Sequence, residues 1–406
     1  MQRRGDTSEP GVVLGIIEGE ADMKLTKEQW LAQYNGRLSD RDLYLLGKAY
    51  DVLRRNTVKY DNAPWGEKSV ISPWIGGGEG IWNWDSAFHA MTVSRFDTPL
   101  AKDCIDCFME FQLEDGMLPD VVYANGKIID NYSKPPVMAW AVLTVFERDG
   151  DIDFLADNYE RLVAYEAFWT RDRQDRGLFF YSAQKNPEKD DYLHPRWESG
   201  WDNSPRWDRP IVDMWAIDLN CYMVIYYRAM SKMAKYLNKP HEQWDDKEKV
   251  LSALIEKQLF DEKAGAYVDR SRSSGEYSKV LSPASFMPLF VGIASKDHAA
   301  AMERLALDKN KFYPGMPTVS YDDPTFSNGY WRGQTWLNVA YFAAKGLRSY
   351  GYVNTADQIK EFLLDMVYDN SEQGIFENYD TVNRKGMYCD SFSWSAAFVI
   401  EFILNW

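Results

Sequence analysis

The sequence has few of the residues that bind metals and redox cofactors. It contains four cysteines and four histidines among 406 residues. Cys104 and Cys107 form a single C-x-x-C motif, which without a second pair or a nearby histidine is weak evidence for zinc. Their spacing also fits one face of a helix, where we expect them to be small buried residues. Because no histidine pair has catalytic zinc spacing and no EF-hand loop is present, we expect no metal site and no cofactor.

Basic patches, long apolar runs and nucleotide-binding loops are also missing. The 61 acidic side chains outnumber the 46 basic ones, and the net charge of −15 argues against nucleic acid or an anionic membrane as a partner. The glycine-rich stretch 75–80 lacks the phosphate-loop and dinucleotide-binding patterns. Glu and Pro interrupt the stretch after Arg3 and Arg4, which predicts neither a secretory signal nor a membrane span. We therefore expect a cytoplasmic protein with a neutral or polar small-molecule ligand; the sequence does not indicate an oligomeric state.

Helical periodicity, in contrast, runs along most of the chain. Three stretches, 137–146, 214–227 and 335–347, are apolar nearly all round, which is typical of helices buried on both sides. We therefore predict an all-α (α/α)6 barrel with an inner and an outer ring of helices and short β-hairpins in its loops; a helical solenoid is the alternative. Residues 1–38 are expected to be an extension packed on the barrel, and 39–406 the barrel itself. The twelve predicted helices cover roughly 39–58, 83–95, 98–112, 135–148, 151–172, 210–236, 240–259, 283–293, 296–307, 331–349, 353–368 and 390–405.

Tryptophan and carboxylate recur together in the loops between these helices. The pairs are Trp84-Asp85, Trp197-Glu198, Trp201-Asp202 and Trp207-Asp208. Flat aromatic rings cover the C–H faces of a pyranose, and carboxylates accept hydrogen bonds from its hydroxyls, so this combination favours a sugar site. The alternative is that the tryptophans are core residues and the acids cap helices. In a helical barrel such loops gather at one end, around the mouth of a central cavity.

Two of the acids are candidates for the hydrolysis of a glycosidic bond, which needs two carboxyl groups. Asp202 is the better candidate for the acid, because Gly200 allows a sharp turn and Trp201 can exclude water from the carboxyl, which raises its pKa. Glu377 is also flanked by aromatic residues and could face Asp202 across the barrel mouth. Composition alone does not choose these two among 61 acids.

The motifs that carry these residues resemble a known family. The segments ESGWDNSPRWD (198–208), WNWDSAFHA (82–90), YWRGQTW (330–336) and FENYD followed by FSWSAA (392–397) are similar to glycoside hydrolase family 63 and the trehalase-like clan of inverting (α/α)6-barrel glycosidases. The resemblance implies that Asp202 is the general acid and Glu377 the general base. It also implies a sugar subsite formed by Trp84, Asp85, Gln112, Trp201, Trp331 and Arg332. Trp82, Trp140, Tyr330 and Trp394 are further candidates for substrate binding.

By this resemblance, the chain is expected to be an inverting α-glycosidase that cleaves a small α-linked glucoside. A trehalase or a glucosyl- or mannosylglycerate hydrolase is the alternative, although the trehalase G-G-G-E-Y run is not present near Glu377. A sugar epimerase would use paired histidines, and only His194 lies near the predicted mouth. A sugar-binding protein without catalysis would not need both carboxyls. Lys134, Tyr330 and Tyr388 are candidates for the aglycone subsite, where a basic residue would suit the carboxylate of glycerate; Lys134 could equally be a solvated surface residue.

Overall fold

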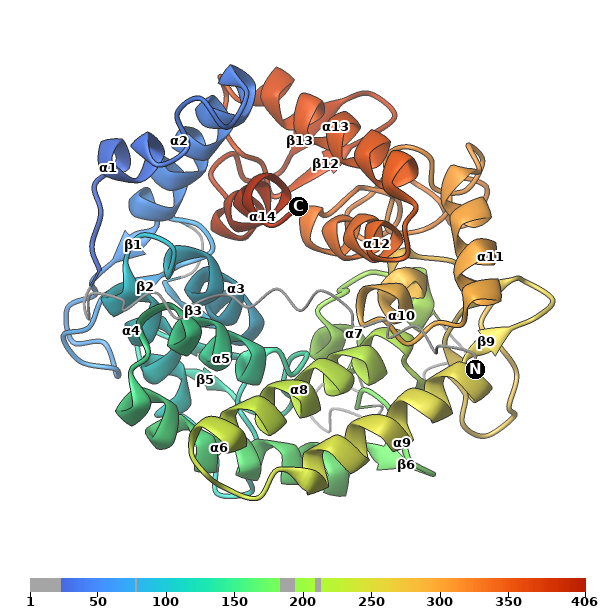
Figure 1. The fold of residues 1–406 in the computed structure, drawn as a ribbon, viewed down its shortest axis with the longest axis horizontal. Coiled ribbons are helices and arrows are strands. Elements are labelled where there is room, and N and C mark those ends of the chain that lie inside the picture. Colours follow the sequence, from blue (N-terminus) through green and yellow to red (C-terminus); the bar gives the residue numbers. More distant parts are fainter. Residues whose placement is uncertain (1–22, 77–78, 183–193, 209–212) are drawn as a thin grey trace, which may run out of the picture.

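Twelve helices form two concentric rings in the computed structural model, which describes residues 23–76, 79–182, 194–208 and 213–406 (Figure 1). The inner ring consists of α3 (Asn83–Val93), α5 (Met138–Asp149), α8 (Ile217–Tyr236), α10 (Met287–Phe290), α12 (Leu337–Ser349) and α14 (Ser393–Leu404). The outer ring consists of α2 (Asp40–Arg55), α4 (Thr98–Met109), α6 (Ile152–Asp172), α9 (Glu242–Gln258), α11 (Lys296–Leu307) and α13 (Val353–Asn370). Each inner helix contacts the next one, and α14 contacts α3, which closes the ring. The predicted (α/α)6 barrel is confirmed.

Burial separates the two rings as the apolar patterns predict. Every residue of α3 is buried, and α12 and α14 are buried along nearly their whole length. The outer helix α9, in contrast, buries only Trp244, Leu251 and Ile255. A helix that is packed on both sides needs apolar residues all round, whereas an outer helix needs only one apolar stripe. The three stretches predicted to be buried on both sides all belong to inner helices, α5, α8 and α12.

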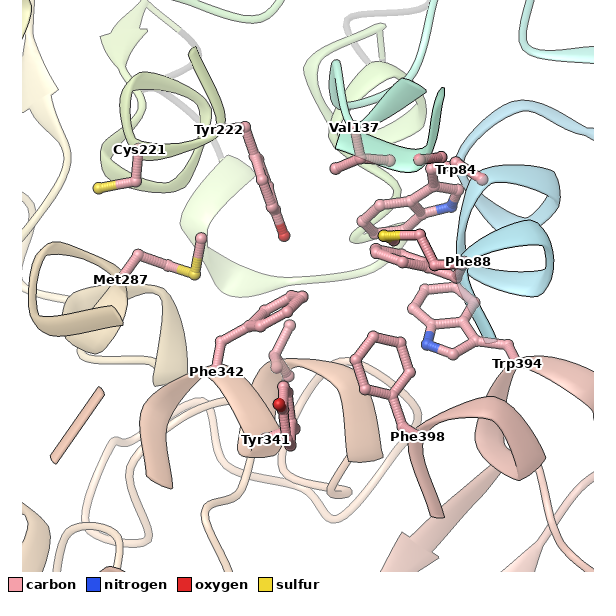
Figure 2. Close-up of a cluster of buried hydrophobic side chains, with 14 of the residues drawn as sticks. Trp84, Phe88, Val137, Cys221, Tyr222, Met287, Tyr341, Phe342, Trp394 and Phe398 are labelled. Atoms are coloured by element: carbon pink, nitrogen blue, oxygen red, sulfur yellow. The ribbon is translucent and has the colours of Figure 1, made fainter. Parts of the chain in front are cut away.

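Aromatic and other apolar side chains from the inner helices close the middle of the barrel. Figure 2 shows Phe88, Tyr222, Met287, Phe342 and Phe398 converging from different inner helices. The ring centroids of Phe88, Tyr222 and Phe398 lie 6.2, 6.2 and 5.5 Å from that of Phe342. The barrel is therefore a packed core, and a ligand site must lie at one of its ends.

Short strands and helical turns shape the loops at the ends of the barrel. Strands β3, β4 and β5 form a three-stranded antiparallel sheet, and the other strands form antiparallel pairs. Strand β3 leads directly into α3, and β12 pairs with β13 just before α14. The strands are β1 (Thr57–Val58), β2 (Val70–Ile71), β3 (Gly80–Trp82), β4 (Val121–Tyr123), β5 (Ile128–Ile129), β6 (Gln174–Asp175), β7 (Leu178–Phe179), β8 (Met214–Trp215), β9 (Phe260–Asp261), β10 (Ala266–Tyr267), β11 (Arg270–Ser271), β12 (Asn378–Asp380) and β13 (Lys385–Met387). The short helices are α1 (Lys27–Ala32), α7 (His194–Ser199) and the 3₁₀ turns η1 (Pro205–Trp207) and η2 (Pro283–Phe286).

One difference from the predicted elements is the start of α12. We predict a helix from residue 331, but the helix begins at Leu337. Gly333 has φ +133°, and a Cβ at this position would lie 2.6 Å from the ring of Phe326. Thr335 forms a β-bridge with Tyr379 instead of a helical turn. The segment before α12 is therefore a loop that is held by residues distant in the sequence.

Other differences concern the ends of elements. Helix α8 begins at Ile217 rather than near residue 210, and residues 209–212 lie outside the described part. Of the predicted extension 1–38, residues 23–38 are described and include α1, which packs on α2. The division into extension and barrel stays a prediction. In the described ranges, no helix is both long enough and apolar enough to cross a membrane.

Candidate active site

The loops that lead into the inner helices bring four carboxyl groups and one lysine together. Asp85 lies in the first turn of α3, Asp120 just before β4, and Lys134 in the loop before α5. Asp202 follows α7, and Glu377 precedes β12. Because an outer helix returns the chain after each inner helix, the inner helices run in the same direction and their N-terminal ends share one face of the barrel. Electrostatic interactions join the five side chains there.

Asp202 is positioned by contacts of its neighbours in the chain. Gly200 has φ +74°, and a Cβ there would lie 2.2 Å from Cζ2 of Trp84. The predicted sharp turn is therefore present, and it presses the loop against α3. On the other side, Oδ1 of Asn203 accepts a hydrogen bond from the backbone N–H of Trp331 at 2.8 Å. The carboxyl of Asp202 is thus held between α3 and the loop that precedes α12.

A buried ion network fixes the far end of the same loop. The guanidinium of Arg206 donates to Asp218 at 2.8 and 2.9 Å and to Asp269 at 2.8 and 2.9 Å. It lies between the rings of Trp201 and Trp207, at 4.8 and 4.9 Å from their centroids. All three charged groups are almost completely buried. Since Asp218 is in the first turn of α8, the network ties the Asp202 loop to an inner helix.

Glu377 is held by the hairpin that follows it and by a tyrosine. The hydroxyl of Tyr330 donates to Oε1 of Glu377 at 2.8 Å. The backbone N–H of Glu377 donates to the carbonyl of Cys389 at 2.8 Å, and its carbonyl accepts from the hydroxyl of Ser395 at 2.9 Å. Tyr330 itself has φ +55°, in the left-handed region that non-glycine residues seldom adopt. The strained backbone at Tyr330 aims its hydroxyl at the carboxylate.

Burial gives the carboxyl groups unusual acidities. It raises the pKa of Asp202 to about 6 and that of Asp85 to about 8. Burial also raises the pKa of Glu377, while the hydrogen bond from Tyr330 acts in the opposite direction. The positive charge of Lys134 opposes the effect of burial on the pKa of both Asp85 and Asp202. Near neutral pH, protonated and ionised carboxyl groups therefore coexist in the cluster, as general acid and base catalysis requires.

The predicted aromatic residues divide into a buried set and a partly exposed set. Trp201 and Trp331 have no exposed surface, and their ring centroids lie 4.8 Å apart. Trp84 and Trp394 are also buried, with centroids 4.7 Å apart. These four rings pack in two pairs within the core, and their contact with a sugar stays a prediction. The partly exposed residues of the set are Trp82, Trp140 and Tyr330.

Two predicted subsite residues are engaged elsewhere. The side-chain amide of Gln112 donates to the carbonyls of Gly116 and Arg161 at 2.9 and 2.7 Å, which ties its loop to the outer helix α6. The guanidinium of Arg332 pairs with Asp208, whose carboxylate also accepts from Arg196. No described interaction joins either side chain to the carboxyl cluster. Gln112 therefore links two backbone segments and Arg332 belongs to a separate ion-pair group, while their contact with a sugar stays a prediction.

Asp120 is the member of the cluster that the sequence did not single out. It ends the QLEDGMLPD segment, whose position before an apolar helix is the only signal for it. Lys134, predicted as either an aglycone contact or a surface residue, is 6% exposed, so it is not a surface residue. Tyr388 is 58% exposed, with its ring 5.0 Å from that of Tyr330. The side chain of His194 lies outside the described part of the structure.

Comparisons with known proteins identify relatives of this chain. The family model of the mannosylglycerate hydrolase MGH1-like glycoside hydrolase domain matches residues 78–395. Mannosylglycerate hydrolases of Rubrobacter radiotolerans and Thermus thermophilus are 24% and 26% identical to this chain over 413 and 436 residues. These matches cover 80% and 87% of this chain, and 90% and 99% of the relatives. A GH63 mannosylglycerate hydrolase from Thermus thermophilus, solved in complex with Tris and D-glycerate, has the same fold, with a TM-score of 0.75 at 24% identity over 88% of this chain and 99% of that one.

Proposed function

The chain belongs to the mannosylglycerate hydrolase MGH1-like glycoside hydrolase family, and on this basis we propose that it hydrolyses a small α-glycoside of glycerate with inversion at the anomeric carbon. Membership confirms the resemblance to family 63 glycosidases and makes the chain a glycosidase. The substrate, the inversion and the catalytic residues are the proposal. They rest on the relatives and on the geometry of the carboxyl cluster.

The observation that carries the proposal is the contrast between Asp202 and Glu377. Burial raises the pKa of Asp202 to about 6, so a substantial fraction of its carboxyl groups is protonated in mildly acidic solution. Burial raises the pKa of Glu377 as well, but the hydrogen bond from Tyr330 opposes this effect, and the negative charge of Glu377 is one of the causes that raise the pKa of Asp202. A carboxyl group that is protonated beside one that is ionised is what acid and base catalysis of glycoside hydrolysis requires, and we assign these two states to Asp202 and Glu377.

In the proposed reaction, Asp202 donates its proton to the glycosidic oxygen as the bond from this oxygen to the anomeric carbon breaks. Glu377 removes a proton from a water molecule, whose oxygen attacks the anomeric carbon from the opposite face. The products are a sugar of inverted configuration and the free aglycone. Because a water molecule must fit between Glu377 and the sugar, the two carboxyl groups should be separated by roughly 6.5–9.5 Å.

The relatives favour a glycoside of glycerate over the small α-glucoside expected first. The two relatives described above are mannosylglycerate hydrolases. We therefore assign mannosylglycerate or glucosylglycerate to this chain as its substrate class. The choice between mannose and glucose depends on contacts with the sugar hydroxyls in the cleaving subsite.

A hydrolysis panel tests the proposal. Purified protein should release sugar and D-glycerate from mannosylglycerate or glucosylglycerate, and should act more slowly on trehalose, kojibiose and nigerose. Proton NMR at early times should show the β-anomer of the released sugar. Initial release of the α-anomer would contradict inversion, and preference for a disaccharide would contradict the substrate class.

The two carboxyl roles are tested by exchange of each group for its amide. Asp202→Asn should abolish turnover of the natural glycoside. Its rate of hydrolysis of a glycosyl fluoride should fall less, because the fluoride leaving group needs no proton. Glu377→Gln should abolish both reactions, because nothing then deprotonates the water. Equal losses for both substrates in Asp202→Asn would remove the assignment of this residue as the acid.

A further inference from the structure

Lys134 is a buried cation within the carboxyl cluster. Its side chain is 8% exposed, and its Nζ lies 3.1 Å from Oδ1 of Asp120. The same ammonium donates a hydrogen bond to the carbonyl of Trp197, and it lies 5.6 Å from the centroid of the Tyr132 ring. A lysine is seldom buried this deeply unless negative charge surrounds it, because removal of the ammonium from water is costly.

The two partners of Lys134 belong to the segments that carry Asp85 and Asp202. The carbonyl of Asp120 accepts a hydrogen bond at 2.9 Å from the backbone N–H of Asn83, two residues before Asp85. Trp197 lies in α7, which leads through the turn at Gly200 to Asp202. The ammonium is therefore placed between the start of α3 and the loop of the proposed general acid.

Several acids surround Lys134, and its ammonium is their counterion. It faces Asp85 from α3, Asp120 from the segment before β4, and Asp202 from the loop after α7. Tyr123 of β4 and Tyr132 of its own loop are near Asp120, and Tyr330 lies near Glu377, Asp202 and Asp85. Glu198 is close too, but it forms its own ion pair with Arg173 at 3.0 Å. Among these described groups, Lys134 is the positive charge not already paired outside the cluster.

We propose that Lys134 is a positioning residue that holds the Asp202 loop against α3 and balances the charge of Asp85, Asp120 and Asp202, rather than a contact for the aglycone. The part of this inference that concerns the acid rests on the proposed function. The ammonium of Lys134 forms an ion pair with Asp120 and donates a hydrogen bond to the Trp197 carbonyl, so both of these contacts are made within the protein.

The proposal predicts a change in the pH profile when the charge is removed. Lys134→Gln keeps an N–H donor for the Trp197 carbonyl but removes the positive charge. The pKa of Asp202 should then rise further, and the upper limb of the kcat/KM profile should move to higher pH by about one unit. Lys134→Arg keeps the positive charge, so the upper limb should stay at the same pH even if the catalytic rate of this variant changes. Lys239→Gln is the matched control, since it removes the same charge from an exposed pair with Glu160 and should leave the limb in place.

A measurement without substrate separates this inference from the proposed function. Without the cation, the folded Lys134→Gln variant should retain more protons on its buried acids between pH 5 and 8. Its stability should therefore fall more steeply than that of the wild type as pH rises, and the gap in Tm between them should widen. Melting curves of wild type, Lys134→Gln and Lys239→Gln across this range test it directly.

The outcomes are distinct. A widening Tm gap in a protein that hydrolyses no glycoside would leave the counterion role standing and reject the function. Parallel melting curves, with an unmoved upper limb in an active enzyme, would overturn the counterion role and leave the function. A higher KM for glycosylglycerates alone, with the limb unmoved, would also overturn it, because Lys134 would then be a substrate contact.

Discussion

At the scale of single residues, the site is a set of carboxyl groups in unequal surroundings. Asp85 is 5% exposed and lies in the first turn of α3, where the free N–H groups of the helix favour an acceptor. Burial nevertheless raises its pKa to about 8, above that of Asp202 at about 6. The acids interact strongly, so they should titrate as a cluster rather than one by one. A protonated Asp85 can still share hydrogen bonds with sugar hydroxyls.

The residue-scale prediction is that Asp85→Ala lowers kcat/KM by at least ~10²-fold, since hydroxyl contacts to a distorted sugar strengthen in the transition state. Steady-state kinetics with the best glycosylglycerate from the panel measure the loss. Circular dichroism should show an intact fold. A near-wild-type rate would reduce Asp85 to a residue that only stabilises the start of α3.

At the scale of elements, packing contacts of the loop 199–208 fix the orientation of the Asp202 carboxyl group. Its first contact is the close approach of Gly200 to Trp84, and its last is the burial of Arg206 between two tryptophans. Neither contact touches Asp202 itself. Both fix the backbone on either side of it, so their loss should affect activity through position.

Gly200→Ala should reduce both stability and kcat/KM, because the new Cβ would lie 2.2 Å from Trp84 in a backbone with φ +74°. Gly126→Ala is the matched control, with φ +84° and no atom within 4 Å of the new Cβ. The control should lose only about 1 kcal/mol for its left-handed conformation and keep full activity. Denaturant unfolding and kinetics compare the pair, and equal effects in both variants would argue against the contact with Trp84.

Arg206→Met should lower the free energy of unfolding by roughly 3–5 kcal/mol, because Asp218 and Asp269 would be left buried without a counterion. The rate should fall with it, as the Asp202 loop loses its anchor to α8. Arg171, paired with Asp172 at the surface, is the comparison; Arg171→Met should leave the free energy of unfolding almost unchanged. Urea unfolding of both variants gives the difference, and a small loss for Arg206→Met would mean that the network is not needed for stability.

At the scale of the whole molecule, the buried carboxyl groups of the site lower the free energy of unfolding when they are ionised. The chain carries a net charge of −15, and its barrel mouth gathers several more acids than bases. Raised carboxyl pKa values mean that the folded state binds protons more tightly than the unfolded state. The stabilisation from those protons is fully present below the ordinary pKa near 4, and it is lost as pH rises through about 6 and about 8.

The molecule should therefore melt at a higher temperature in mildly acidic solution than at pH 8, within the pH range in which the acids on the protein surface remain ionised. Asp202→Asn removes the charge that is costly to bury, so its Tm should exceed that of the wild type at pH 8 by about 2 °C or more, while the gap closes near pH 4. Calorimetry at the two pH values tests this. An equal Tm difference at both would show that Asp202 does not titrate with a raised pKa.

The barrel could be predicted from the pattern of apolar residues along the chain. Helices α5, α8 and α12 are apolar nearly all round, and a helix with no polar face has to be covered on both sides, so the local pattern was enough to assign these three helices to the inner ring. The turn at Gly200 could also be predicted, and Asp202 and Glu377 could be named as candidates from their flanking glycine and aromatic residues, but their roles came only from the resemblance to a family and stay a prediction.

Which side chains meet depends on the folded barrel and could not be predicted from the sequence. The pairing of Lys134 with Asp120, the burial of Trp201 against Trp331, and the use of Gln112 to hold a backbone carbonyl of α6 all join segments distant in sequence. The loop before α12 likewise depends on a bridge from Thr335 to Tyr379. Periodicity reports which face of an element is buried, but not which partner covers it. Partners are chosen by the closure of the whole ring, because only the closed ring brings the N-terminal ends of all six inner helices to one face.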